Sequence, residues 1–372
     1  MKLRIRNIDF ILLATVIALV VFGVVMVYSS GFYRSQHTGG DGTLFLFNQI
    51  QGAVIGLIVM GACAFIPMRW LNNKILPYAG IVVSAILLIL VLIIGKDING
   101  GYRWLKIGSF QFQPSEIARL ALVYFCAYWL AGHGDDIKSK NPRVFFHALA
   151  GPGLATLLIF GLILAGRNLS MSASAAIIVM AMLFAAGINM RAFGTLGLFA
   201  GGGFALFAII EPYRLRRMTI FMNPFSDPGD AGYQLVQSLY ALGSGGLFGV
   251  GLGNSRQKYL HLPYSESDFI LSIIGEEFGF LGMLVLLAAY WIVIWRGTRI
   301  AIKSQNRFNM LMCAGLTALI AVQLLINVAV VTSTMPPTGV PLPFISAGST
   351  SLVIYMAAVG LLLNVSRDIE TL

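Results

Sequence analysis

Long runs of apolar residues alternate along the whole chain with short polar segments. An α-helix needs about 20 apolar residues to cross a bilayer, and a window of that length finds ten such runs. The first run, Ile8 to Tyr28, has no small-residue cleavage site and similar runs follow it, so we expect an anchor and not a removed signal peptide. The ten runs lie near residues 8–30, 46–66, 75–95, 115–132, 146–165, 172–188, 193–211, 268–295, 309–331 and 349–365.

The composition supports the same interpretation. The 372 residues are 58% hydrophobic and only 11% charged, which excludes a soluble globular domain. The three cysteines, Cys63, Cys126 and Cys313, lie in apolar runs, and this argues against a disulfide framework or a cysteine metal site. The sequence predicts an all-α, polytopic integral membrane protein with about ten transmembrane helices in a single membrane domain over residues 1–372.

The distribution of Lys and Arg predicts the orientation, because cytoplasmic segments carry an excess of them. An even number of spans puts both termini on one side, and we expect that side to be the cytoplasm. The cytoplasmic segments then hold fourteen cations: Lys2, Arg4, Arg6, Arg69, Lys74, Lys138, Lys140, Arg143, Arg191, Arg296, Arg299, Lys303, Arg307 and Arg367. The short outer segments and outer helix ends hold six: Arg34, Lys96, Arg103, Lys106, Arg119 and Arg167.

The longest segment between spans, about residues 212–267 between the seventh and eighth, is therefore predicted to lie on the outer side. Long loops cross the membrane whatever their charge. Its cations have two possible roles, which stay open: solvation and anchoring, or contact with an anionic ligand, since Arg binds phosphate in a bidentate manner. They are Arg214, Arg216, Arg217, Arg256 and Lys258.

The same loop has internal structure. An amphipathic stretch, Gln234 to Leu242, is expected to lie in the membrane interface. Six glycines follow between positions 243 and 253, but no strand precedes them and an outer loop does not meet cytosolic nucleotides, so a dinucleotide site is rejected. We expect closely packing backbone that could approach a lipid or a phosphate. No nucleic-acid partner is expected.

Two more outer segments carry candidate site residues. In NGGYRWLKIGSFQFQPSEIAR, the residues Arg103, Trp104 and Lys106 form either an interfacial belt or part of a site. Glu116 and Arg119 share one helix face and form either a self-neutralising pair or contacts to a cavity. In STMPPTGVPLPFISAGSTS four prolines exclude a helix, which predicts a re-entrant loop at about residues 333–348 that lines protein or a water-filled cavity.

Four carboxylates lie in LPYSESDFILSIIGEEFG, a strongly apolar region. Asp268 is either a favourable charge near a helix N-terminus or a functional carboxylate at the mouth of a cavity. Glu276 and Glu277 lie two turns deeper, where capping does not explain them, so we expect them to be cavity acids paired with Arg119 or the loop arginines.

Four motifs in this order resemble the SEDS family (shape, elongation, division, sporulation) over essentially the whole chain. They are GGYRWLKIGSFQFQPSEIAR, EPYRLRRMTIFMNPFSDP, the run from GYQLVQSLYALGSGG to SIIGEEFGFLG, and PPTGVPLPFISAGSTSL. The segment GSGGLFGVGLGNSRQK and the C-terminal LLLNVSR are more similar to the FtsW and SpoVE branch than to RodA.

The resemblance implies a peptidoglycan glycosyltransferase of the bacterial cytoplasmic membrane that polymerises lipid II on the outer face during cell division or sporulation. It implies a class B penicillin-binding protein as partner transpeptidase, with lipid II and the undecaprenyl-pyrophosphate-linked glycan as substrates within the membrane lipid. It also implies a divalent cation, Mg²⁺ or Mn²⁺, whose ligands are left open, and no organic cofactor. The essential aspartate of the family matches Asp268, which is the candidate base. The candidates for substrate and pyrophosphate contacts are Arg103, Trp104, Lys106, Glu116, Arg119, Arg214, Arg217, Arg256 and Lys258.

Two alternatives remain: a lipid II flippase, and a non-catalytic scaffold that activates the transpeptidase. The charge is concentrated on the outer side, which favours a one-sided site over a transport path. The chain departs from the family pattern at several substrate-facing motifs, without losing the aspartate. The departures are at Ile50, Gly166, Arg167, Tyr264, Ala347 and Ser349.

Overall fold

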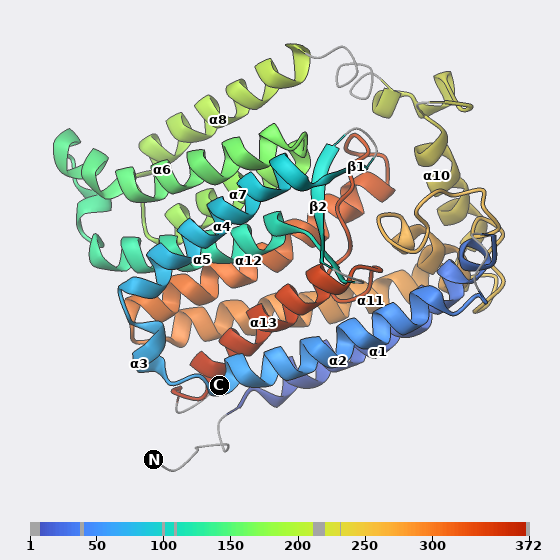
Figure 1. Ribbon diagram of the computed structural model, residues 1–372, viewed down its shortest axis with the longest axis horizontal. Helices are drawn as coiled ribbons and strands as arrows, with labels where there is room; N and C mark the ends of the chain where they lie inside the picture. Colours follow the sequence, from blue (N-terminus) through green and yellow to red (C-terminus); the bar gives the residue numbers. More distant parts are fainter. Residues whose placement is uncertain are drawn as a thin grey trace.

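The computed structural model describes residues 8–37, 41–98, 101–107, 110–210, 220–230 and 232–369. Each of the ten apolar runs forms a long helix, and most of these helices run roughly along one axis of the molecule (Figure 1). The ten helices are α1 (Phe10–His37), α2 (Leu44–Phe65), α4 (Ile75–Ile94), α5 (Pro114–Gly132), α6 (Pro142–Ala165), α7 (Leu169–Ala185), α8 (Met190–Ile210), α11 (Ile270–Lys303), α12 (Arg307–Val331) and α13 (Ser349–Ser366).

Seven of these helices are both long and apolar enough to cross a membrane: α1, α2, α4, α6, α11, α12 and α13. Helix α7 has 17 residues and is shorter than a full span. The fold is therefore all-α and polytopic, as predicted. Helices α1 and α11 extend furthest beyond their predicted spans, because their last turns continue past the apolar runs.

The centre of the bundle is formed by α12 and α13. Helix α13 packs along α2, while α12 contacts α5, α7 and α11. Small residues allow the α2–α13 approach: a β-carbon at Gly360 would lie 2.4 Å from the carbonyl oxygen of Met60, and one at Gly56 would lie 2.4 Å from the sulfur of Met356. Close contact through glycine is the usual way in which apolar helices associate without a hydrophobic driving force.

The start of α1 and the end of α13 meet at one end of the bundle. The carboxylate of Asp9 accepts hydrogen bonds from the amide of Leu12 (3.0 Å) and from Nε of Arg296 (2.6 Å). The amide of Asp9 donates to the hydroxyl of Ser366 (3.3 Å). We call this end the terminal end.

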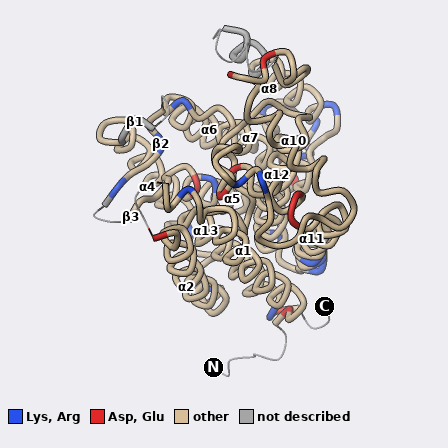
Figure 2. Tube along the Cα trace, turned by 90° about the vertical axis from the view of Figure 1, so that its right-hand side faces the viewer, with Lys and Arg blue, Asp and Glu red and all other residues tan. Residues whose placement is uncertain are grey.

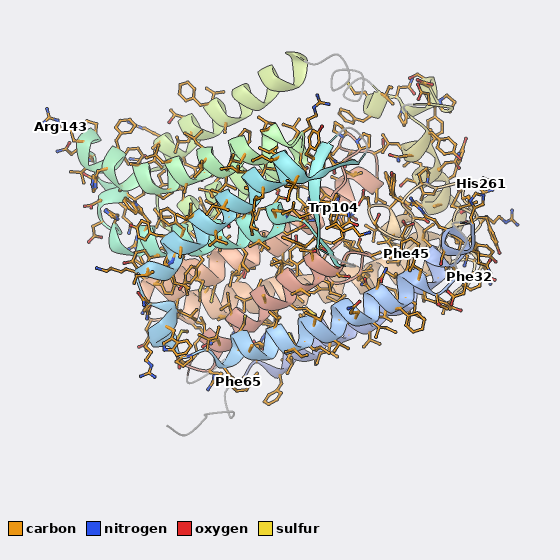
Figure 3. The ribbon with its side chains drawn as sticks, viewed as in Figure 1. Phe32, Phe45, Phe65, Trp104, Arg143 and His261 are labelled. Atoms are coloured by element: carbon orange, nitrogen blue, oxygen red, sulfur yellow. The ribbon has the colours of Figure 1, made fainter. Side chains whose placement is uncertain are left out.

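The opposite end carries the short helix α10 (Tyr233–Gly245) and is called the α10 end (Figure 1). Figure 3 shows Arg143 and His261 at these two opposite ends of the molecule. Other short helices in the described part of the chain include α3 (Met68–Leu71) and the 3₁₀ turns Asp136–Lys138 and Pro224–Ser226.

A small antiparallel sheet, which the sequence analysis did not predict, precedes α5. Its strands are β1 (Lys96–Ile98), β2 (Gly101–Ile107) and β3 (Phe110–Phe112), in the order β1-β2-β3. The sequence does carry a hairpin signal here, because two glycines follow the short strand β1 and are followed by an aromatic-rich stretch. The sheet lies near the α10 end and carries Arg103, Trp104 and Lys106 on β2 (Figures 1 and 3).

The glycine-rich loop, residues 246–258, lies against α11. Its amides at Val250 and Gly251 donate to the carbonyls of Glu276 and Glu277, each at 3.0 Å. The carbonyls of Glu276 and Glu277 can accept these hydrogen bonds from the loop because α11 is interrupted at Gly279, whose φ of 66° and ψ of −167° suit glycine alone. The expected close backbone packing is found at Gly249, where a β-carbon would lie 2.1 Å from the carbonyl oxygen of Glu277, but not at Gly246 or Gly253, where a β-carbon would meet nothing within 4 Å.

Candidate functional site

Asp268 lies two residues before α11, at the α10 end of the bundle. The N-cap position of α11 is Phe269, and no side chain caps the helix there. Within the described part of the chain, the Asp268 carboxylate makes no hydrogen bond and no ion pair. Asp268 therefore makes no capping hydrogen bond, although it lies near the N-terminus of α11, where a negative charge is favourable. The side chain is left available for another partner.

The position of Asp268 is fixed through its backbone. Nδ2 of Asn327 on α12 donates to the carbonyl oxygens of both Asp268 and Val340, each at 2.8 Å. Gly339 lies opposite the carboxylate, since a β-carbon there would be 3.3 Å from Oδ2. The proline-rich loop, residues 332–348, thus forms one wall beside Asp268.

The pKa of Asp268 is raised to about 7, chiefly by burial and also by the nearby negative charge of Glu266, while the cations Arg103 and Arg34 act in the opposite direction. A carboxyl group with this pKa can hold or release a proton near neutral pH, as a general base requires.

The proline-rich loop is buried among helices. Its carbonyls are satisfied by side chains: Nε2 of Gln323 donates to Pro341 (2.9 Å), Nε2 of Gln49 donates to Ile345 (3.2 Å), and the Tyr290 hydroxyl donates to Pro343. Irregular backbone is stable at such a depth only when its polar groups find partners in the protein.

Glu116 and Arg119 form a buried ion pair on α5, and both side chains are at most 1% exposed. Nη1 of Arg119 also donates to Oε1 of Gln323 (2.7 Å) and to the Ser174 hydroxyl (3.1 Å), while Nη2 donates to the Tyr355 hydroxyl (3.2 Å). Arg119 therefore joins four helices, and through Gln323 it connects to the proline-rich loop. Figure 2 shows acidic and basic positions together near the centre of the bundle, around α5.

Glu276 and Glu277 are buried, but their partners differ from those expected. Glu276 accepts hydrogen bonds from the Ser255 hydroxyl (2.5 Å) and from the amide of Arg256 (2.9 Å). Glu277 pairs with Nζ of Lys258 at 3.0 Å. The expectation that Arg119 or the loop arginines neutralise these acids was wrong, because Arg119 pairs with Glu116 and the acids are satisfied by Ser255, the Arg256 amide and Lys258. Both acids hold the glycine-rich loop on α11.

The remaining basic candidates lie in different surroundings. Nη2 of Arg103 donates to the carbonyl oxygen of Arg167 (2.7 Å), which keeps the guanidinium close enough to act on Asp268. Lys106 and Arg256 are exposed, and Trp104 is half-buried. Arg214 and Arg217 lie outside the described residues.

Two residues that were not among the site candidates lie beside Asp268. Nη1 of Arg34, near the end of α1, pairs with Oε1 of Glu266 at 2.8 Å. The Arg34 guanidinium also lies over the ring of Tyr264, 4.7 Å from its centroid. No sequence spacing links residue 34 to residue 266, so only the fold brings them together.

The family model of the FtsW/RodA/SpoVE cell cycle proteins matches residues 10–371. The chain belongs to this family. The match covers every long helix of the bundle, the glycine-rich loop and the proline-rich loop.

Individual relatives of the family match over nearly their whole length. A "Probable peptidoglycan glycosyltransferase FtsW" of Geobacter sp. (strain M18) is 36% identical over 98% of both chains. The "Stage V sporulation protein E" of Bacillus subtilis (strain 168) is 38% identical over 96% of this chain and 97% of its own.

Solved structures share the fold. A chain in "Structural coordination of polymerization and crosslinking by a peptidoglycan synthase complex" has a TM-score of 0.79 and 29% identity over 98% of both chains. The rod shape determining protein RodA of Thermus thermophilus has a TM-score of 0.72 and 29% identity over 99% of both chains.

The family resemblance implied a divalent cation. Among the residues that the structure describes, no group of three or more His, Cys, Asp or Glu side chains is arranged to hold a metal ion. Near Asp268 the protein offers two carboxylates, from Asp268 and Glu266, together with cations that oppose metal binding. The described side chains alone do not fit a metal site.

Proposed function

We propose that the protein polymerises lipid II into peptidoglycan glycan strands, with Asp268 as the general base. The chain is a peptidoglycan glycosyltransferase of the FtsW and SpoVE type, which acts in cell division or sporulation. The observation that carries the assignment of Asp268 is its carboxylate, which lies at the α10 end near the charges of Glu266, Arg103 and Arg34, has no partner among the described residues and has a pKa of about 7.

The reaction joins two lipid II units by inverting transfer. The 4-hydroxyl of an acceptor GlcNAc attacks the anomeric carbon of a donor MurNAc, a new β-1,4 bond forms, and the bond to undecaprenyl pyrophosphate breaks. Asp268 takes the proton of the hydroxyl as the new bond forms. The pyrophosphate leaves with the bonding electrons, and cations stabilise its charge.

The cations of the described site have different suitability for this role. Arg103 is held near Asp268 and is the first candidate for the leaving pyrophosphate. Arg256 and Lys106 are exposed at the same end and are free to approach an anion. Lys258 is neutralised by Glu277 and 3% exposed, so we assign it to the support of the loop.

The geometry supports a one-sided site over a lipid II flippase. A flippase needs a polar path that opens to each face in turn, whereas the Glu116–Arg119 pair is enclosed by side chains of α7, α12 and α13. A pure scaffold does not need a carboxyl group with a raised pKa, so it gives no role to Asp268.

We further propose that a class B penicillin-binding protein is the partner and that both termini are cytoplasmic, with Asp268 on the outer side. A chain of similar fold occurs in a peptidoglycan synthase complex. The terminal end carries Arg143, Arg296 and Lys303, as the excess of cytoplasmic cations predicts. The divalent cation stays a prediction.

The proposed function is tested with purified lipid II and purified protein, alone and in complex with its transpeptidase. We expect glycan polymer in gels when the complex is present. Translocation of lipid II across vesicles without polymer would favour the flippase. Activation of the transpeptidase on preformed glycan strands, without any polymer from lipid II, would favour the scaffold.

A further inference from the structure

Glu266 is a buried carboxylate with an incomplete set of partners. The residue is 4% exposed, and its Oε1 pairs with Nη1 of Arg34 at 2.8 Å. Its second oxygen, Oε2, is buried and has no hydrogen-bond partner in the described part of the chain. A buried carboxylate of this kind is costly to the fold, because its remaining lone pairs have lost water. This unfavourable burial occurs at a position only two residues from Asp268.

The backbone prevents Glu266 from moving away from Asp268. The amide of Ala347 donates to the carbonyl of Glu266 at 2.9 Å, and the hydroxyl of Ser346 donates to the carbonyl of Ser267 at 2.6 Å. Asn327 holds the carbonyl of Asp268 at 2.8 Å. Three successive carbonyls are thus fixed to the proline-rich loop and α12, so the two side chains keep a set relation.

The charged groups around Asp268 come from three elements. Glu266 lies on its own segment, Arg103 comes from β2, and Arg34 comes from α1. Gly339 of the proline-rich loop and Asn327 of α12, which also lie beside Asp268, carry no charge. Glu266 is therefore the one described acid that acts on Asp268.

We propose that Glu266 and Arg34 are positioning residues for Asp268: the charge of Glu266 makes Asp268 a stronger base for the sugar proton, and Arg34 holds that charge in place. An ordinary aspartate has a pKa of about 4 and is a weak base for a sugar hydroxyl. A neighbouring carboxylate favours the protonated form of Asp268, because protonation removes the repulsion between the two charges. The inference rests on the proposed function, since it assigns a role within the same site.

The test compares pH profiles of kcat/KM for lipid II polymerisation in the protein–transpeptidase complex. Glu266→Gln removes the negative charge and should move the acidic limb to lower pH by about one unit. Arg34→Gln removes the opposing positive charge and should move the limb to higher pH. Arg34→Lys keeps the charge and should leave the limb near its wild-type position. Asp41→Asn is the matched control, because it removes an exposed carboxylate from the same end of the bundle and should leave the profile unchanged.

A second measurement does not require activity. Water-soluble carbodiimide reacts with protonated carboxyl groups, and peptide mass spectrometry separates labelling at Asp268 from labelling at Glu266. The labelling midpoint of Asp268 should fall in Glu266→Gln and rise in Arg34→Gln. Shifts in one common direction, or unchanged midpoints in folded variants, would overturn the inference. If wild type makes no polymer while the midpoints still move, the proposed function fails and the electrostatic relation stands.

Discussion

Lys258 and Glu277 form a buried ion pair in which Nζ and Oε1 lie 3.0 Å apart, at the junction of the glycine-rich loop with α11. The hydroxyl of Ser29 on α1 contacts both partners, at 3.2 Å from Nζ and 2.8 Å from Oε1. The pair therefore fastens the loop to two helices. A lysine in this position is expected to support the site and not to bind pyrophosphate.

Lys258→Met should destabilise the protein strongly, by about 3 kcal/mol or more, because it leaves a buried carboxylate without its cation. The double variant Lys258→Met with Glu277→Gln should recover most of the lost stability and of the polymerase activity. Thermal unfolding in detergent and lipid II consumption measure the two effects. A double variant that is stable but inactive would indicate that Lys258 contacts the substrate.

Exchanging the charges of Glu116 and Arg119 should not restore function. The glutamate of the Arg119→Glu change is shorter than arginine and would not reach Gln323 and Tyr355, so the links to α12 and α13 would be lost. We expect each single variant and the exchanged pair to be at least tenfold less active than wild type. Near wild-type activity of the exchanged pair would show that the two residues only neutralise each other.

Much of the fold could be predicted because its signal is local. Each apolar run of about 20 residues became a helix, since no other structure satisfies its backbone in lipid. The burial of Glu116 and Arg119 followed from their positions in such a run. Asp268 was noted as an acid at the end of an apolar run, but its role as the base was implied only by the family resemblance.

The partners of these residues could not be predicted, because they depend on contacts between distant segments. Glu276 is satisfied by a hydroxyl and backbone amides about 20 residues earlier, and amides carry no signature in the sequence. Arg34 meets Glu266 only because α1 continues beyond its apolar run. The hairpin of β1 and β2 was missed because its strands are short and lie between two strong helical signals.

The orientation can be tested with reporter fusions. Fusions at Ser139 and Lys303 should report the cytoplasm, and a fusion at Asp230 should report the outer face. The reason is the excess of Lys and Arg in the segments assigned to the cytoplasm. An outer signal from Ser139 would contradict the ten-span arrangement.

Activity should depend on pH through Asp268. The base must be charged to accept a proton, and its pKa is about 7, so kcat/KM should rise up to about pH 7 and level off above it. The free energy of unfolding should change with pH in the opposite direction to kcat/KM. The folded pKa lies above the unfolded value of about 4, so the contribution of Asp268 to stability is present at low pH and lost as the pH rises through about 7. Asp268→Asn should therefore unfold at a higher temperature than wild type at pH 8. If Asp268 were instead a helix cap, the same change should lower the unfolding temperature.

The central claim is that Asp268 is the general base. Asp268→Asn keeps the size and most of the polarity of the side chain, but an amide cannot accept the proton of a sugar hydroxyl. Asp268→Glu keeps the charge and misplaces it, so it should also be poor.

The decisive measurement is the consumption of lipid II by purified Asp268→Asn in complex with its transpeptidase. We expect normal expression, normal association with the partner and almost no glycan polymer. Polymerisation within a few-fold of the wild-type rate would contradict the assignment of Asp268 as the base.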